Sequence, residues 1–373
     1  MAIFQPQTAQ QFFERHEVEN AKVNLSASAL EPVSLGELLS FSPGSEDRFR
    51  NNRLDYTPRH GSPILLENIS KLYNTLGAEN ILVTSGVDDA LGMLSLALLK
   101  SGDRVVVLCP TYPPHVQLPA HFGAQVIPWR ATEENGWAPD LDELRKLVSV
   151  PTRMVIAGFP QNPTGFMPDK AYASEMIEIV TNSGAVLISD EIYAGLPAGS
   201  DLSGSNLADQ DDRVISLNGL SKTYGLPGLR VGWIASKNKA VMASIKSTRD
   251  LFNAYTPNPV EILAEIALEN KDKLYKRNAS IVSAGAVASA EFFRKHSDLF
   301  EWKAPQAGVL SFPKWLGPGG ARNLSERLIA DVSIALAPGE CFDAGDDNLR
   351  FSVGQRSVVD GLDQLHHYLE TNF

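Results

Sequence analysis

Cysteine is scarce in this chain, and several classes of protein are excluded by what is missing. Only Cys109 and Cys341 occur among 373 residues, so the chain can build neither a disulfide framework nor a cysteine-based zinc site. No run of 18 apolar residues is present to span a membrane. Residues 1–20 also lack the apolar stretch and cleavage site of a signal peptide. We expect a cytoplasmic protein without a metal site.

Positive charge is also in short supply. The chain has 33 Lys and Arg against 44 Asp and Glu, a net charge of −11. Nucleic acids and membrane surfaces attract basic patches, so we expect neither as a partner. The hydrophobic content of 43% and the charged content of 21% are ordinary for a globular protein. A length of 373 residues favours two lobes.

Short strand-like runs alternate with helical patterns between residues 81 and 236. The runs are ILVTSG (81–86), DRVVVLCP (103–110), RMVIAGFP (153–160), AVLISDEIY (185–193), RVISLNG (213–219) and LRVGWIAS (229–236). Residues 88–102 and 169–184 have helical spacing and each ends in a glycine, as at a helix C-terminal cap. This alternation predicts an α/β fold with a mostly parallel sheet covered on both faces.

The pattern changes after about residue 240. Residues 258–296 form one long helical pattern, and strand candidates follow at 308–315, 333–339 and 349–354. We expect a separate, smaller α+β lobe here. The first 45 residues show no strong period, and either join this lobe or run across the active face.

Chemically useful residues follow five of the predicted strands, at the edge where open parallel sheets bind ligands. Gly86 precedes a helix whose free N–H groups can bind phosphate. Tyr112 can stack on a planar ligand, and Asn162 projects an amide from a tight turn. Asp190 ends an apolar strand, where a buried carboxylate needs a partner, and Lys222 follows the next strand.

Each of these residues, taken alone, has an ordinary structural explanation as part of a turn, a core rim or a backbone cap. Together they describe one ligand. It is a flat heteroaromatic ring that carries a phosphate, a basic ring nitrogen and an aldehyde for the lysine.

The motifs resemble those of the class I/II aminotransferases of fold type I, the aspartate aminotransferase-like enzymes that use pyridoxal 5′-phosphate (PLP). The matching segments, in chain order, are DYTPRHG, TSGVDDA, CPTYPP, PQNPTG, SDEIY, GLSKTYGLPGLRVGW and LRFSVG. The resemblance runs from about Tyr56 to Arg350. It implies a large PLP-binding domain at 46–270 with a mainly parallel seven-stranded sheet, and a small domain formed by 1–45 and 271–373.

The resemblance also implies roles for residues around the cofactor ring. Lys222 matches the Schiff-base lysine, which also moves the substrate's Cα proton. Asp190 matches the acid that pairs with the pyridinium nitrogen. Asn162 and Tyr193 match the partners of the ring's 3-hydroxyl oxygen, and Tyr112 the stacking residue. Lys222, Asp190 and Tyr193 are therefore the expected catalytic residues.

The expected phosphate site combines one side chain with backbone donors. Arg230 matches the family's phosphate-binding arginine, and Gly86, Val87 and Asp88 match the backbone donors. Two departures from the family occur. Gly219 stands where many relatives carry a serine, so Ser221 is expected to compensate. A carboxylate beside a phosphate is unfavourable unless it points away, for instance to cap the helix, so the Asp88 side chain is a poor ligand candidate.

Substrate binding is expected from residues outside the ring site. Arg350 matches the guanidinium that binds the substrate α-carboxylate with two hydrogen bonds, with Asn162 beside it. Tyr56 matches a tyrosine that reaches the phosphate of the neighbouring subunit, which implies a homodimer with composite active sites. The alternatives are a surface salt bridge for Arg350 and a core tyrosine at position 56. Arg59 and His60 either face the substrate or belong to a solvated loop.

The resemblance does not by itself name the reaction. We expect an aminotransferase that moves an amino group from an L-amino acid to a 2-oxo acid through the Lys222 Schiff base and a quinonoid intermediate. The alternative is a PLP-dependent cyclase, lyase or oxidase of specialised amino-acid metabolism, similar to capreomycidine synthase. A non-catalytic cofactor-sensing module is a third class, and it would need an attached DNA-binding domain.

Overall fold

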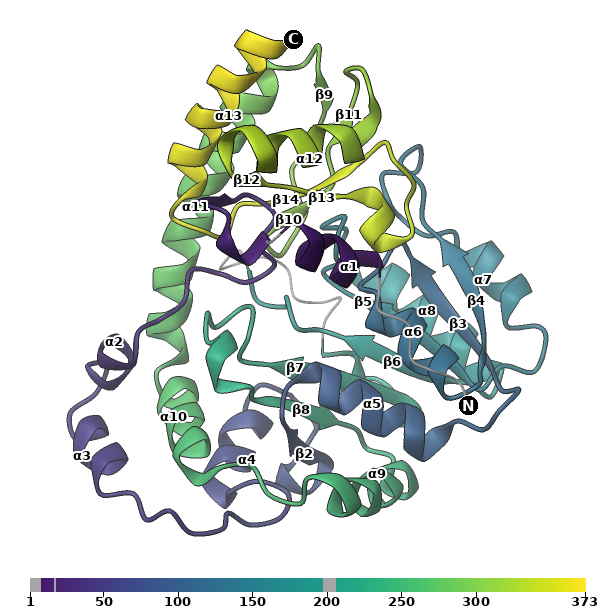
Figure 1. The fold of residues 1–373 in the computed structure, drawn as a ribbon. Helices are drawn as coiled ribbons and strands as arrows, with labels where there is room; N and C mark the ends of the chain where they lie inside the picture. The colour runs from purple at the N-terminus through teal and green to yellow at the C-terminus, as the bar shows by residue number, and fades with distance from the viewer. Residues whose placement is uncertain (1–7, 17, 197–205) are drawn as a thin grey trace.

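The computed structural model describes residues 8–16, 18–196 and 206–373. Residues 1–7, on which the signal-peptide prediction partly rests, lie outside the described residues. A seven-stranded sheet lies in the lower part of the molecule in Figure 1, with strand order β2-β8-β7-β6-β5-β3-β4. Its strands are β2 (Ile81–Thr84), β3 (Arg104–Cys109), β4 (Gln125–Arg130), β5 (Met154–Gly158), β6 (Val186–Asp190), β7 (Val214–Gly219) and β8 (Gly232–Ala235).

The sheet is mainly parallel, as predicted. Strand β8 runs antiparallel to both of its neighbours, β2 and β7. The pairs β3–β4, β3–β5, β5–β6 and β6–β7 are all parallel. The carboxyl ends of β3, β5, β6 and β7 therefore meet at one edge, and the segments that follow them approach one another.

Strand β4 is the one strand of this sheet that none of the six strand-like runs predicted. It contains Pro128, which pairs in register with Val107 of β3. Proline cannot donate a ladder hydrogen bond and is tolerated at a sheet edge. Since β4 is an edge strand and half-exposed, it lacks the continuous apolar run that marks the central strands.

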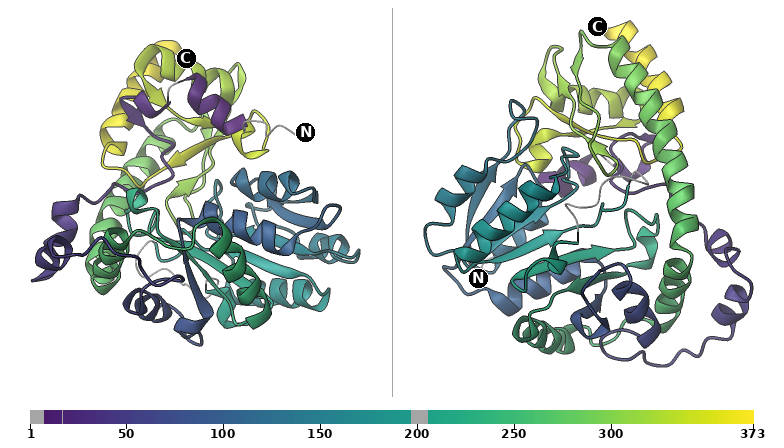
Figure 2. Two further views of the ribbon diagram at one scale, coloured as in Figure 1. Left: turned by 60° about the horizontal axis from the view of Figure 1, so that its bottom comes forward. Right: turned by 180° about the vertical axis from the view of Figure 1, so that it is seen from behind.

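Helices cover both faces of the sheet (Figures 1 and 2). One face packs through Val106, Val155 and Leu187, and the other through Val107, Ile156 and Ile188. The first face is covered by α4 (Pro63–Ser70), α7 (Leu141–Leu147), α8 (Lys170–Asn182) and α10 (Asn258–Glu269). The second is covered by α5 (Val87–Leu98), α6 (Pro114–His121) and α9 (Lys239–Phe252).

Helix ends follow the predictions in part. Helix α8 ends at Asn182, and Gly184 follows its cap with φ +86°, as expected of a C-terminal glycine. Helix α5 ends at Leu98, before Gly102, which instead turns the chain into β3. The long pattern at 258–296 divides at Asn270 into α10 and α11 (Lys271–Lys295). None of the described helices is long and apolar enough to cross a bilayer.

The C-terminal part forms the predicted smaller α+β lobe above the sheet (Figure 1). Strands β10 (Leu310–Ser311), β14 (Leu349–Ser352) and β13 (Ala337–Pro338) form an antiparallel sheet, β9 (Phe300–Glu301) pairs with β11 (Lys314–Trp315), and β1 (Val23–Asn24) pairs with β12 (Ile334–Ala335). Its helices are α12 (Gly320–Val332), α13 (Val358–Asn372) and the upper turns of α11, which runs from one part to the other (Figure 2). The remaining helices are α1 (Thr8–Arg15), α2 (Leu35–Leu39) and α3 (Ser45–Arg50).

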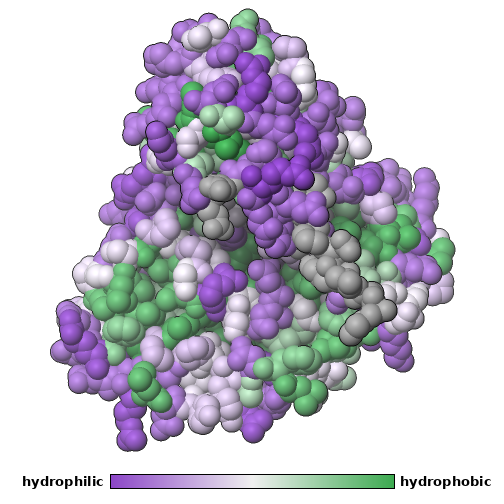
Figure 3. Space-filling model, in the orientation of Figure 1, coloured by the Kyte–Doolittle hydropathy of each residue, from purple (hydrophilic) through white to green (hydrophobic). Residues whose placement is uncertain are grey.

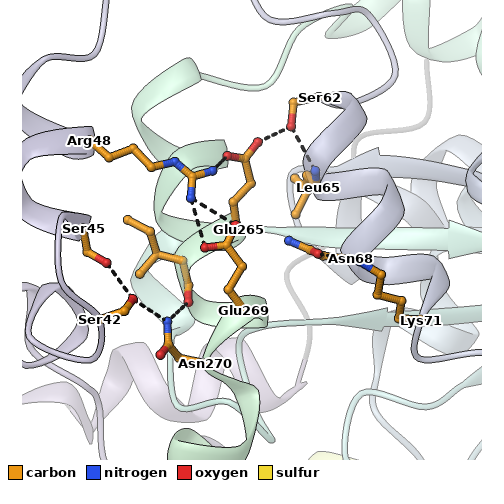
Figure 4. A network of polar contacts seen from close by, with 11 residues as sticks. Ser42, Ser45, Arg48, Ser62, Leu65, Asn68, Lys71, Glu265, Glu269 and Asn270 are labelled. Carbon is orange, nitrogen blue, oxygen red and sulfur yellow. Dashed lines mark hydrogen bonds and ion pairs between the residues drawn. The ribbon is translucent and has the colours of Figure 1, made fainter.

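A polar network fastens the segment between α3 and α4 to α10 (Figure 4). Arg48 of α3 binds Glu269 at 3.0 Å and also pairs with Glu265. The hydroxyl of Ser62, which caps α4, donates to the same Glu265. Because both ends of residues 51–61 are held in this way, the exposed Tyr56 within them is carried on an anchored segment.

Candidate active site

A pocket opens where the strand ends converge. Its lining includes most of the residues predicted from the sequence, namely Val87, Asp88, Tyr112, Asn162, Asp190, Tyr193, Ser221, Lys222 and Arg230. Gly86 adjoins the pocket as the N-terminal cap of α5, and Arg350 reaches it through Asn162. Tyr56 does not line it. Figure 3 shows that the surface over the C-terminal lobe is mostly hydrophilic, whereas hydrophobic residues gather over the lower part of this face.

Lys222 lies just beyond the end of β7, with its amine deep in the pocket. The amine donates a hydrogen bond to Ser28 Oγ at 2.7 Å and lies 6.0 Å from the centre of the Tyr193 ring. The residue as a whole is half-buried. This burial, with the nearby Arg350 guanidinium as the next cause, lowers the pKa of Lys222 to about 8. A neutral, nucleophilic amine is therefore available near neutral pH.

Asp190 ends β6 and is buried with a partner that sequence reasoning missed. His115 Nε2 lies 3.0 Å from Asp190 Oδ2, and His115 Nδ1 lies 2.9 Å from Thr111 Oγ1. The second carboxylate oxygen of Asp190 accepts the N–H of Ile192 at 3.1 Å. Both oxygens are thus held, so the carboxylate has a fixed orientation at the pocket. The available signal was that His115 follows Tyr112 by one helical turn in TYPPH.

The start of α5 and Arg230 form an anion-binding corner. Gly86 has φ +97°, a conformation that favours glycine, and a Cβ atom there would lie 2.6 Å from Arg230 Nη2 and displace the guanidinium. Arg230 Nη1 donates to Ser221 Oγ at 3.2 Å. Free backbone N–H groups at the helix N-terminus and a half-exposed guanidinium together suit a phosphate.

Asp88 and Asp89 divide their roles differently from the expectation. The carboxylate that contacts the backbone just before α5 is that of Asp89, whose Oδ2 accepts the N–H of Ser85 at 2.8 Å. The Asp88 carboxylate turns toward the pocket instead. It accepts a hydrogen bond from the Tyr112 hydroxyl at 3.1 Å and lies 3.7 Å from Arg230 Nη2. The Asp88 carboxylate therefore neutralises part of the Arg230 charge that a phosphate would use.

This placement predicts that Asp88→Asn binds PLP more tightly. Two like charges about 4 Å apart repel each other by about 1 kcal/mol even in bulk water, so the dissociation constant should fall at least about fivefold. Fluorescence titration of the cofactor-free protein with PLP measures it. Asp89→Asn is the matched control, because it removes the same charge from the next residue of the chain. It should change the dissociation constant less. Weaker binding in Asp88→Asn contradicts the repulsion and assigns Asp88 to orienting Arg230.

Gly219 has a packing reason that the sequence did not reveal. It pairs with Gly232 of β8 at the end of β7. A Cβ atom at Gly219 would lie 2.7 Å from the carbonyl oxygen of Val231 and 3.0 Å from Gly232 Cα. Both contacts are with backbone, so no side chain fits here without a shift of β8. Ser221, which contacts Arg230, is the hydroxyl that remains at this corner.

The ring-binding candidates lie on two sides of the pocket. Tyr112 is half-buried, and its ring meets His115 edge to face with centres 5.8 Å apart. Tyr193 is buried, and its hydroxyl donates to the Ser28 carbonyl at 3.0 Å. Burial raises the pKa of both tyrosines, so both hydroxyls stay protonated and can donate hydrogen bonds at neutral pH.

Arg350 on β14 is buried and faces Asn162 across the pocket. Its guanidinium donates to the Ser26 carbonyl at 2.8 Å, to Ser26 Oγ at 3.3 Å and to Asn162 Oδ1 at 3.4 Å. It also lies 4.7 Å from the centre of the Phe342 ring. None of these contacts is with a carboxylate, which excludes the salt-bridge alternative among the described residues. A buried guanidinium without an anionic partner suits a ligand carboxylate.

The segment DYTPRHG lies apart from the pocket of its own chain. Tyr56 is 80% exposed and stacks obliquely on Tyr255, with ring centres 4.6 Å apart. The core-tyrosine alternative is therefore wrong. Arg59 and His60 face Asp250 of α9, at 3.3 Å and 3.9 Å, and do not line the pocket. Within one chain, Arg59 and His60 therefore belong to a loop and do not face the substrate.

The donor set fits PLP. The pocket combines a buried amine of lowered pKa, a fixed carboxylate and an anion-binding corner that glycine at position 86 permits. These groups match the aldehyde, ring nitrogen and phosphate of that cofactor. A mainly parallel sheet with this site at its carboxyl edge defines a PLP-dependent enzyme of fold type I.

The family model described as aminotransferase class I and II matches residues 47–362. This chain belongs to that family, and it is a PLP-dependent transferase.

Individual relatives include aminotransferases, a synthase and a cyclase. Capreomycidine synthase of Streptomyces vinaceus is 30% identical over 94% of this chain and 91% of its own. Aspartate aminotransferase of Sulfurisphaera tokodaii is 25% identical over 82% and 79%. Among solved structures, a PLP-dependent aminotransferase from Streptococcus suis has a TM-score of 0.92 with 28% identity, and the PLP-dependent cyclase OrfR one of 0.86 with 26%. Each covers 99% of both chains.

Proposed function

We propose that this chain transfers an amino group from an L-amino acid to a 2-oxo acid, with Lys222 as the residue that attaches PLP and moves the proton. The observation that carries this proposal is the Lys222 amine, which has a pKa lowered to about 8 and lies in one pocket with Asp190 and Asn162. When bound, PLP supplies an electron-withdrawing ring that makes the Cα–H bond of an attached amino acid acidic.

The chain's own residues divide the remaining work. Arg350 and Asn162 bind the substrate α-carboxylate, which fixes Cα relative to the Lys222 amine. Lys222 would take the Cα proton and hold it on Nζ until it is returned. Asp190, oriented by His115, holds the charged ring nitrogen. Asn162 would donate to the ring's oxygen, and Tyr193 would do so only by giving up its hydrogen bond to the Ser28 carbonyl.

The phosphate end and the ring face complete the set. Arg230, Ser221 and the backbone N–H groups of Gly86, Val87 and Asp88 hold the phosphate. Tyr112 covers one ring face.

A second candidate reaction is cyclisation or elimination without an amino acceptor. It is favoured by the similarity to capreomycidine synthase and to the cyclase OrfR, which each span over nine-tenths of this chain. Both reactions begin with the same proton removal by Lys222. They differ in whether the proton is returned or a substituent on Cβ is lost.

Acceptor dependence separates the two reactions. We expect the holoenzyme, incubated with a panel of L-amino acids, to turn over continuously only when a 2-oxo acid is added, and to give equal amounts of new amino acid and new 2-oxo acid by mass spectrometry. Sustained turnover without an acceptor assigns the cyclase or lyase reaction instead. No change of absorption spectrum with any amino acid contradicts both.

We also propose a homodimer in which Tyr56 completes the partner's phosphate site. Tyr56 is exposed on an anchored segment, near the exposed apolar side chains of Leu54, Leu251 and Phe252. Covering such side chains is what a subunit interface does. A solution mass of twice 40.6 kDa is expected, and a monomer that is active at all concentrations contradicts it.

The domain boundaries and the cellular location of the protein are also proposals. We propose that residues 46–270 form the cofactor-binding domain and that 1–45 with 271–373 form the small one, supported by the β1–β12 pair and the contact of α11 with α13. Hydrogen exchange that responds to substrate near residues 45 and 270 checks it. Two free, buried cysteines support a cytoplasmic location, which cell fractionation tests.

A further inference from the structure

An N-terminal strap, residues 23–30, is built into the small lobe. Val23 and Asn24 pair with Ile334 and Ala335 in β12. The Leu25 N–H donates to the Ala335 carbonyl at 3.0 Å, and its carbonyl accepts the Ser352 N–H at 2.8 Å. Strand-type bonds on both sides fix the position of the strap, so what it presents to the pocket is also fixed.

Two serines of the strap contact different parts of the active site. Ser26 accepts hydrogen bonds from Arg350 through its carbonyl and its hydroxyl. Ser28 accepts one from the Lys222 amine through Oγ at 2.7 Å and one from the Tyr193 hydroxyl through its carbonyl at 3.0 Å. One short segment therefore contacts the proposed carboxylate-binding residue and the proposed proton-moving residue separately.

We propose that Ser28 is a positioning residue for Lys222, whose hydroxyl keeps the amine directed at the substrate's Cα through the proton transfer. This inference rests on the proposed function. The proton passes from Cα to Lys222 Nζ, and Ser28 gains and loses none. A lysine amine on a flexible four-carbon stem has many orientations, and one short hydrogen bond to a fixed partner selects among them.

A hydroxyl suits this task because the amine changes its protonation state. Serine can accept from the ammonium and, after rotation, donate to the lone pair of the neutral amine. A carboxylate could only accept, and would favour the ammonium. The charged groups that act on Lys222 are Arg350, Asp88, Arg230 and Asp190. Ser28 adds an orienting contact to them without adding charge.

The test uses the holoenzyme in heavy water. Exchange of the α-hydrogen of an accepted amino acid with solvent, followed by NMR, reports the proton transfer directly, and its dependence on amino acid concentration gives KM. For Ser28→Ala we expect the maximal exchange rate to fall about tenfold, with KM within twofold of the wild type, because one hydrogen bond to a charged or reacting group is lost. Ser28→Thr, which keeps the hydroxyl, should recover most of the rate.

Ser26→Ala is the matched variant on the same strap. It should raise KM more than it lowers the maximal rate, because Ser26 contacts Arg350 and not Lys222. The pH at half-maximal exchange should fall in Ser28→Ala, since loss of an acceptor destabilises the ammonium form of Lys222. A purely structural role would not give this split between the two serines.

Several results overturn the assignment. An unchanged exchange rate in Ser28→Ala does so, as does an equal loss in Ser28→Thr, or the same division between KM and rate in both alanine variants. If the wild type exchanges no α-hydrogen with any amino acid, the proposed function fails instead. In that case the pH titration of the visible absorption of the bound cofactor still tests Ser28, and an unshifted midpoint in Ser28→Ala overturns its contact with Lys222.

Discussion

Replacing Lys222 by alanine removes the visible absorption of lysine-bound PLP and lowers turnover by roughly a thousandfold or more. The substitution deletes both the nucleophile that attaches the cofactor and the general base, and a positioned base alone contributes about 10²–10⁴-fold. Arg230, Ser221 and the start of α5 remain, so the variant should still bind PLP. Absorption spectra and initial rates with an accepted amino acid are the measurements.

Two further substitutions make this result specific. Lys222→Arg keeps the positive charge but is never neutral, so it should be as inactive as the alanine variant. Lys239→Ala removes an exposed lysine at the start of α9 and should behave as the wild type. The assignment of Lys222 is lost if Lys222→Ala keeps the visible absorption band.

The pKa of about 8 adds a pH dependence to the same residue. A lysine at its ordinary pKa of 10.5 is almost wholly protonated at pH 8, whereas Lys222 is about half neutral there. The rate at which PLP attaches to the cofactor-free wild type should therefore rise with pH and level off above about 8. A rate that keeps rising to pH 10 contradicts the lowered pKa.

Replacing Arg350 by alanine lowers kcat/KM for the amino acid by roughly 100- to 1,000-fold. Each hydrogen bond to a charged group contributes about 1.5–3 kcal/mol, and a carboxylate bound by a guanidinium loses two of them. The loss should be largest in kcat/KM, because the contact also fixes Cα for proton transfer. Steady-state kinetics with an accepted amino acid measure the effect. Bound PLP should keep its lysine-bound absorption band, with a raised pH midpoint because Arg350 helps to lower the Lys222 pKa.

Lysine and a surface arginine provide the controls. Arg350→Lys keeps the charge without the two-pronged geometry and should fall between wild type and alanine. Arg356→Ala, four residues beyond the end of β14, removes an exposed arginine and should leave kcat/KM unchanged. If Arg350→Ala retains the wild-type kcat/KM, Arg350 does not bind the substrate.

Local sequence patterns predicted the central strands well because those strands are buried on both faces and read as continuous apolar runs. The edge strand β4 was not predicted, since half of its side chains face solvent and Pro128 interrupts the pattern. The division of residues 258–296 at Asn270 was not predicted either. Both halves keep helical spacing, and only the packing of α10 and α11 reveals the break.

The residues of the candidate site were also predictable only in part from the sequence. Gly86, Asn162, Asp190 and Lys222 could be found because each lies at or within four residues of the end of a strand, and the topology of a parallel sheet brings such positions to one edge. The contact of His115 with Asp190 could not be found in this way, since it joins residues 75 apart in the chain. Sequence motifs describe neighbours along the chain, and this contact depends on how α6 packs against the sheet.

By itself, the sequence determined the fold class, the cofactor and the residues at the strand ends, because apolar periodicity and motif order are local properties. Only the tertiary structure decided which oxygen faces which nitrogen. It turned Asp88 toward Arg230, excluded a side chain at Gly219 and brought Ser28 to Lys222 across 194 residues of chain. The reason is that such contacts depend on the packing of whole elements, and no pattern of neighbouring residues records that packing.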